Sequence, residues 1–99
     1  MREIFTATRE QSTALAALAY HVADCNYITE RYGTLDPEAH KADANVKATF
    51  RDLDKLEVPF WVQNTIVAFA TDWRRFKSVY MDSYLRSKGI DLIPAKRGL

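Results

Sequence analysis

Apolar residues recur at intervals of three and four positions along three long segments of the 99-residue chain. This spacing places them on one face of an α-helix, because about 3.6 residues complete each helical turn. The pattern therefore predicts helices over about 8–32, 37–56 and 59–88, each with an apolar stripe that faces a shared core. The stripes consist of Leu15, Leu18, Val22, Cys25 and Tyr32 in the first segment, Ala39, Ala42, Val46, Phe50 and Leu53 in the second, and Val62, Ile66, Phe69, Trp73, Phe76 and Tyr80 in the third, with Tyr84 beside them.

Residues with strong capping preferences mark the turn between the first two helices and the start of the first. Thr8 and Gln11 stand in the Thr-x-x-Gln relation of a capping box, in which each side chain bonds the other residue's backbone N–H. Gly33 follows the first segment, at the position where a left-handed residue commonly ends a helix. Asp36 precedes Pro37, which is the combination expected at the start of the second helix.

The start of the third helix has two candidates, Pro59 and Asn64. Three helices of these lengths can lie side by side, so we predict an all-α, up-down-up three-helix bundle. Residues 1–99 form one domain in this prediction, with a tail over 90–99. The pieces 2–6 and 90–93 are short and β-compatible. These two segments could pair as a small β-ribbon, although the predicted bundle does not require it.

The composition agrees with one small globular domain. Apolar residues make up 47% of the chain and charged residues 27%, with three Gly, three Pro and one Cys. These values exclude a disordered tail and a disulfide scaffold. One Cys cannot form an internal disulfide, which favours a reducing, cytoplasmic environment. No run of about 18 uncharged apolar residues occurs, so the sequence predicts no membrane span.

Charge is distributed unevenly, although the net charge is only +1. Residues 1–71 carry a net charge of −3, and residues 72–99 carry +4. The basic end supports an alternative function as a nucleic-acid-binding accessory protein, in which Lys88, Lys96 and Arg97 contact phosphates. Helical geometry weakens this alternative. The cations of the third helix flank its apolar stripe on both sides, whereas a groove-reading helix gathers its cations on one exposed face.

The two histidines and the cysteine are the candidate chemical groups. His21 and Cys25 are four positions apart on the first helix, so they could ligate one metal or act as base and nucleophile. His40 and an acid would have to complete such a site from the second helix, in no recognised spacing, and placement in the core is the better interpretation. No Gly-rich phosphate loop, Gly-x-Ser-x-Gly, Cys-x-x-Cys or His-Glu-x-x-His motif occurs. We therefore expect no catalytic centre, metal, cofactor or small-molecule substrate.

A second apolar face on the first and third helices is the feature that indicates a function. A three-helix bundle buries one stripe per helix, so a second face would remain in water in a monomer. Tyrosines among alanines are typical of interfaces, because the rings provide contact area and alanine permits close approach. The residues of these faces are Ala16, Tyr20, Ala23 and Tyr27 on the first helix, and Val67, Ala70, Met81 and Leu85, accompanied by Arg74 and Lys77, on the third.

These faces predict a non-enzymatic protein-binding module, such as an adaptor, an inhibitor or an assembly subunit. The partner is a protein, and a second copy of the chain, giving a homodimer, is one form that it could take. The simpler interpretation is that single exposed tyrosine and methionine side chains are common on protein surfaces and need no partner.

Overall fold

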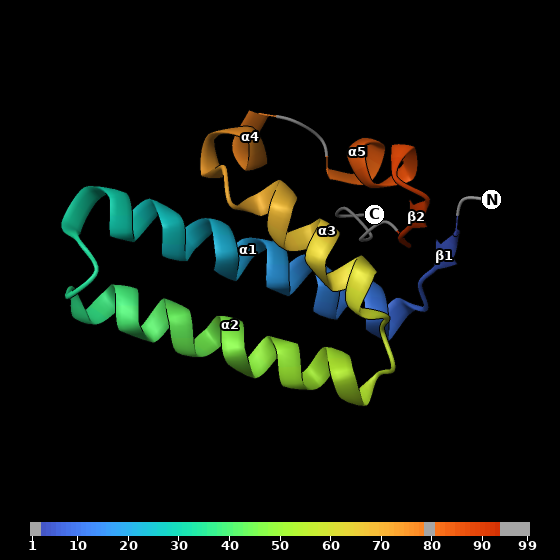
Figure 1. Cartoon of the computed structure of the whole chain (residues 1–99), viewed down its shortest axis with the longest axis horizontal. Helices are drawn as coiled ribbons and strands as arrows, with labels where there is room; N and C mark the ends of the chain where they lie inside the picture. The colour runs from blue at the N-terminus through green and yellow to red at the C-terminus, as the bar shows by residue number, and fades with distance from the viewer. Residues whose placement is uncertain (1–2, 79–80, 94–99) are drawn as a thin grey trace, which may run out of the picture.

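The computed structural model describes residues 3–78 and 81–93 and is mostly helical (75%). The elements in chain order are β1 (Phe5–Thr6), α1 (Arg9–Tyr32), α2 (Pro37–Lys55), α3 (Phe60–Ala70), α4 (Trp73–Ser78), α5 (Met81–Ser87) and β2 (Ile90–Asp91). Figure 1 shows α1 and α2 as a long pair lying side by side, with α3, α4 and α5 on the α1 side of that pair. The prediction of a helical fold is confirmed, and a tiny two-stranded sheet is present in addition.

The first two helices begin and end within one residue of their predicted boundaries. The capping box is present: the Thr8 hydroxyl accepts a hydrogen bond from the backbone N–H of Gln11 at 3.2 Å, and the Gln11 side chain accepts one from Thr8 at 2.8 Å. Asp36 accepts a hydrogen bond from the N–H of Glu38 at 2.8 Å and so caps α2. Gly33 has a φ of +92°, which a residue without a Cβ adopts at little cost.

The prediction of one continuous third helix over 59–88 is wrong. The helix begins directly after Pro59, rather than at Asn64, and it stops at Ala70. Asp72 then starts a new helix, because its side chain accepts hydrogen bonds from the backbone N–H groups of Arg74 at 3.0 Å and Arg75 at 3.3 Å. The Arg75 side chain closes the end of α3 by donating to backbone carbonyls of that helix. This break needs neither a proline nor a glycine.

The break at Thr71–Asp72 changes how the C-terminal third is packed. α4 contacts α1, and α5 contacts α3 and leads into β2 (Figure 1). β2 pairs in parallel with β1, with Phe5 opposite Ile90 and Thr6 opposite Asp91. The two β-compatible ends therefore do form a small ribbon. The description of the fold as a simple up-down-up bundle has to be replaced by an α1/α2 hairpin with α3, α4 and α5 folded over it.

Most of the predicted stripes form the core, where Leu15, Leu18 and Phe69 are among the largest fully buried side chains. Tyr32 is an exception: it is the last residue of α1, next to the exposed turn, and is 64% exposed. The predicted core position Tyr80 lies outside the described residues. The chain after β2 also joins the core, since Leu92 is buried and the backbone N–H of Ile93 donates to the Ser12 hydroxyl at 2.9 Å.

Within residues 3–78 and 81–93, no helix combines the length and the apolar character that crossing a membrane requires.

Candidate functional site

The second apolar face of α1 is partly covered by α4. Ala23 is buried and Tyr27 is half-buried, so the expectation that they stay in water in a monomer is wrong. The physical reason is the break at Asp72, which lets α4 turn back onto the C-terminal half of α1. Ala16 is exposed, and Tyr20 is 58% exposed, as expected for surface positions.

The second apolar face predicted for the third helix does not exist as one surface. Leu85 is 0% exposed and Ala70 is likewise buried, while Val67 and Met81 are half-buried and pack against the core. The predicted face is absent because its residues are divided among α3, α4 and α5. Leu85 of α5 packs in the core. Arg74 is exposed. The side chain of Lys77 lies outside the described part of the chain.

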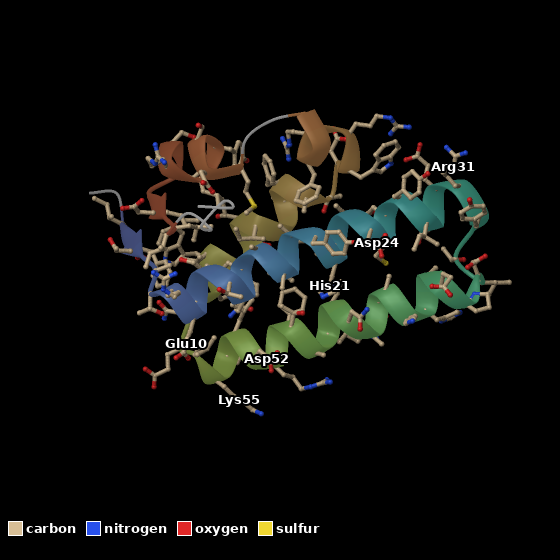
Figure 2. All side chains as sticks on the ribbon, turned by 180° about the vertical axis from the view of Figure 1, so that it is seen from behind. Glu10, His21, Asp24, Arg31, Asp52 and Lys55 are labelled. Carbon is tan, nitrogen blue, oxygen red and sulfur yellow. The ribbon has the colours of Figure 1, made fainter. Side chains whose placement is uncertain are left out.

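Side chains of α1 and α4 line a small open groove, which we call the aromatic groove. Its volume is about 270 Å³. Figure 2 shows that Asp24 belongs to α1, while Asp52 is carried by the neighbouring helix α2. The residues that line the groove are Tyr20, Ala23, Asp24 and Tyr27 of α1 and Trp73 and Phe76 of α4. The groove therefore contains three of the residues predicted for the interface and adds Asp24 and two residues predicted for the core.

An aromatic contact and a charged contact fix α4 to α1 at one end of this groove. The rings of Tyr27 and Trp73 meet edge to face, with centroids 4.9 Å apart and planes at 88°. The indole N–H of Trp73 donates to Glu30 Oε2 at 2.7 Å. Arg74 donates to both carboxylate oxygens of Glu30, and its guanidinium lies 4.3 Å from the centroid of the Trp73 ring. We call this contact of Glu30 with Trp73 and Arg74 the Glu30 clamp.

Hydrogen bonding in the Glu30 clamp stabilises the ionised carboxylate. The bonds from Arg74, and next those from Trp73, hold the pKa of Glu30 below its ordinary value. The hydrogen bonds that Arg74 donates to Glu30 raise the pKa of Arg74 above its ordinary value. The clamp is a surface contact, so its main effect is to fix the position of α4 rather than to stabilise the whole fold.

The Glu30 clamp should release when the protein is acidified, and the indole N–H of Trp73 should report the release. Because the pKa of Glu30 is lowered on folding, the clamp is intact above the ordinary carboxyl range and is lost as the pH falls through the lowered value. An NMR titration of the indole N–H resonances should give Trp73 the same midpoint as the Glu30 carboxyl. Trp61 is the internal control, and a shared midpoint for both tryptophans would contradict the assignment.

The candidate chemical groups do not form a site of their own. Cys25 and His40 line another small pocket, between α1 and α2, and the Cys25 thiol points at the carbonyl of Ala39 at 3.9 Å. His21 instead lies against the ring of Tyr20, with centroids 5.7 Å apart. Among the residues that the structure describes, no three His, Cys, Asp or Glu side chains are placed to hold a metal ion.

Two of the cations in the basic C-terminal third are engaged within the chain. Arg74 belongs to the Glu30 clamp. Arg75 bonds carbonyls of α3 and lies 5.2 Å from the ring centroids of Phe69 and of Tyr84. Lys88 is exposed, with its ammonium 5.6 Å from the Tyr84 ring. The other predicted phosphate contacts, Lys96 and Arg97, lie outside the described residues.

Sequence reasoning missed Asp24, Glu30 and the role of Trp73. Asp24 could have been found, because it stands one turn from both Tyr20 and Tyr27 on the same helical face. The contact of Glu30 with Trp73 joins residues 43 positions apart and depends on the break at Asp72. The pair Thr71–Asp72, which resembles a helix start, was the one local signal of that break.

Comparison of the chain with known proteins gives no match to any protein family and no significant similarity to curated proteins or to solved structures.

Proposed function

We propose that the protein is a non-enzymatic protein-binding module, such as an adaptor, an inhibitor or an assembly subunit, and that it holds its partner in the aromatic groove between α1 and α4. The observation that carries the proposal is the gathering of four aromatic side chains, from two helices, in one open groove. Tyrosine and tryptophan are the residues most enriched among those that dominate binding energy at protein interfaces.

The exposed ring of Tyr20 supports this proposal. Tyr20 is 58% exposed although it lines the groove, so a partner would bury a large apolar surface there. Ala16 stands one turn before it on α1 and is exposed as well, which leaves room for a partner's backbone to approach. A partly buried aromatic platform beside a small residue is the arrangement that an interface anchor needs.

The lining of the groove favours binding over catalysis. Its described side chains are aromatic apart from Ala23 and Asp24. Asp24 is the one carboxylate of this described lining, which includes no histidine, cysteine, serine or lysine to act with it as base or nucleophile. The volume of about 270 Å³ is also at the lower limit of cavities that enclose a small-molecule substrate. These features suit insertion of a side chain from another protein.

The nucleic-acid alternative has less support among the described residues. Of its three candidate phosphate contacts, Lys88 is exposed, whereas Lys96 and Arg97 lie outside the described residues. The neighbouring cations Arg74 and Arg75 are engaged within the chain. A second copy of the chain is one form of protein partner, and light scattering over a concentration series distinguishes a homodimer from a monomer that binds a different protein.

Tyr20→Ala should abolish partner binding without unfolding the protein. The ring is an exposed interface anchor in our proposal, so its loss should cost about 2 kcal/mol or more in association. Tyr32→Ala is the matched control, because Tyr32 is on the same helix and is 64% exposed but is not part of the groove. Tagged protein should recover a partner with wild type and Tyr32→Ala, and lose it with Tyr20→Ala. Equal recovery by all three would refute the proposed site.

A further inference from the structure

The aromatic groove contains a carboxylate that is not paired with a cation from the described part of the chain. Asp24 is half-buried and lines the groove, and none of the residues that the structure describes forms an ion pair with it. Glu30, one helical turn and a half further along α1, is paired with Arg74. Asp24 is therefore the position at which the groove can attract a positive charge.

The rings around Asp24 are suited to the same ligand. The faces of aromatic rings attract cations, and this chain already uses that attraction nearby: the Arg31 guanidinium lies 5.5 Å from the centroid of Tyr27. Neither Arg31 nor Arg74 lines the groove in the described part of the chain. The ring of Tyr20 stands one helical turn before Asp24 and has no cation over it among the described residues.

We infer that the aromatic groove binds a lysine side chain presented by a basic segment of the partner protein, with the ammonium group between the ring of Tyr20 and the carboxylate of Asp24. This inference rests on the proposed function and specifies the chemistry of the partner. An apolar side chain would bury the Asp24 carboxylate without a counter-charge, which is unfavourable, and an acidic one would be repelled by it.

An oligolysine peptide is the probe that tests this inference. Added to the full-length protein, it should shift the indole N–H resonance of Trp73, which lines the groove, and leave that of Trp61 unchanged. An oligoglutamate peptide of the same length should shift neither. Asp24→Asn should weaken oligolysine binding about three- to tenfold, the loss expected for one partly desolvated charge contact.

A matched variant separates a local contact from general attraction. Asp52→Asn changes the net charge of the chain equally, but Asp52 is exposed on α2 and does not line the groove (Figure 2). It should leave the oligolysine affinity unchanged. Equal weakening by the two variants, or binding of tetramethylammonium as tight as that of oligolysine, would overturn the inference.

The ring contribution has its own pair of variants. Tyr20→Phe should keep the oligolysine affinity because the ring remains, whereas Tyr20→Leu should lose it. Failure of this inference differs from failure of the proposed function. If Tyr20→Ala abolishes capture of the natural partner while Asp24→Asn captures it like wild type, the groove still binds a protein, and the inserted side chain is not cationic.

Discussion

Replacing Phe69 by alanine should lower the free energy of unfolding by about 3 to 5 kcal/mol, the cost of removing a fully buried aromatic side chain. Phe69 is 0% exposed, and its ring centroid lies 4.8 Å from that of Tyr84 and 6.4 Å from that of Phe76. The Arg75 guanidinium that closes α3 also lies over this ring. The substitution therefore removes the side chain that α3, α4 and α5 share.

Phe60→Ala is the matched control for this prediction. Phe60 is the first residue of the same helix and is 78% exposed, so its loss should change stability by less than about 0.5 kcal/mol. Urea unfolding followed by circular dichroism measures both variants. A similar small loss for the two would show that Phe69 is not at the centre of the core, and would contradict the packing described above.

Leu85→Asp should destabilise the protein by at least about 3 kcal/mol, because it places a carboxyl group in the core without a partner. Leu85 is 0% exposed on a short helix, and its burial depends on α5 turning back onto α3. A loss of this size is a large part of the total of about 5 to 15 kcal/mol that stabilises a typical small domain.

The outcome for Leu85 also decides between two interpretations of the third apolar segment. Ser83→Asp introduces the same charge at an exposed position of α5 and should have little effect on stability. If Leu85→Asp is instead as stable as Ser83→Asp and only prevents self-association, Leu85 belongs to an interface, as the continuous-helix pattern predicted. Urea unfolding and light scattering of both variants distinguish these results.

The parts of the fold that local chemistry determines were predictable. Thr8 with Gln11, and Asp36 with Pro37, mark helix starts within a few residues, and α1 and α2 have the predicted boundaries to within one residue. Their apolar stripes are long and regular, so the apolar spacing alone predicted most of the core positions on these two helices.

The third segment could not be predicted in the same way, because tertiary contacts decide its path. Its apolar spacing continues across Thr71 and Asp72 as though the helix did not end there. The helix ends there because Asp72 caps the next helix and the Arg75 side chain bonds carbonyls of α3. The position of α4 then depends on the contact of Trp73 with Glu30, which lie 43 positions apart. None of these contacts leaves a periodic signal, so the groove was predicted only through its α1 residues.

The most direct test of a protein-binding groove is site-specific photo-crosslinking in cells. The photoreactive amino acid benzoylphenylalanine, placed at position 20, projects an aromatic ring from the groove with little change in shape. The same group at position 32 is the control, since Tyr32 is exposed on α1 outside the groove. Our account predicts a discrete protein adduct from position 20 and none from position 32. Adducts to nucleic acid alone, or the same protein adduct from both positions, would contradict it.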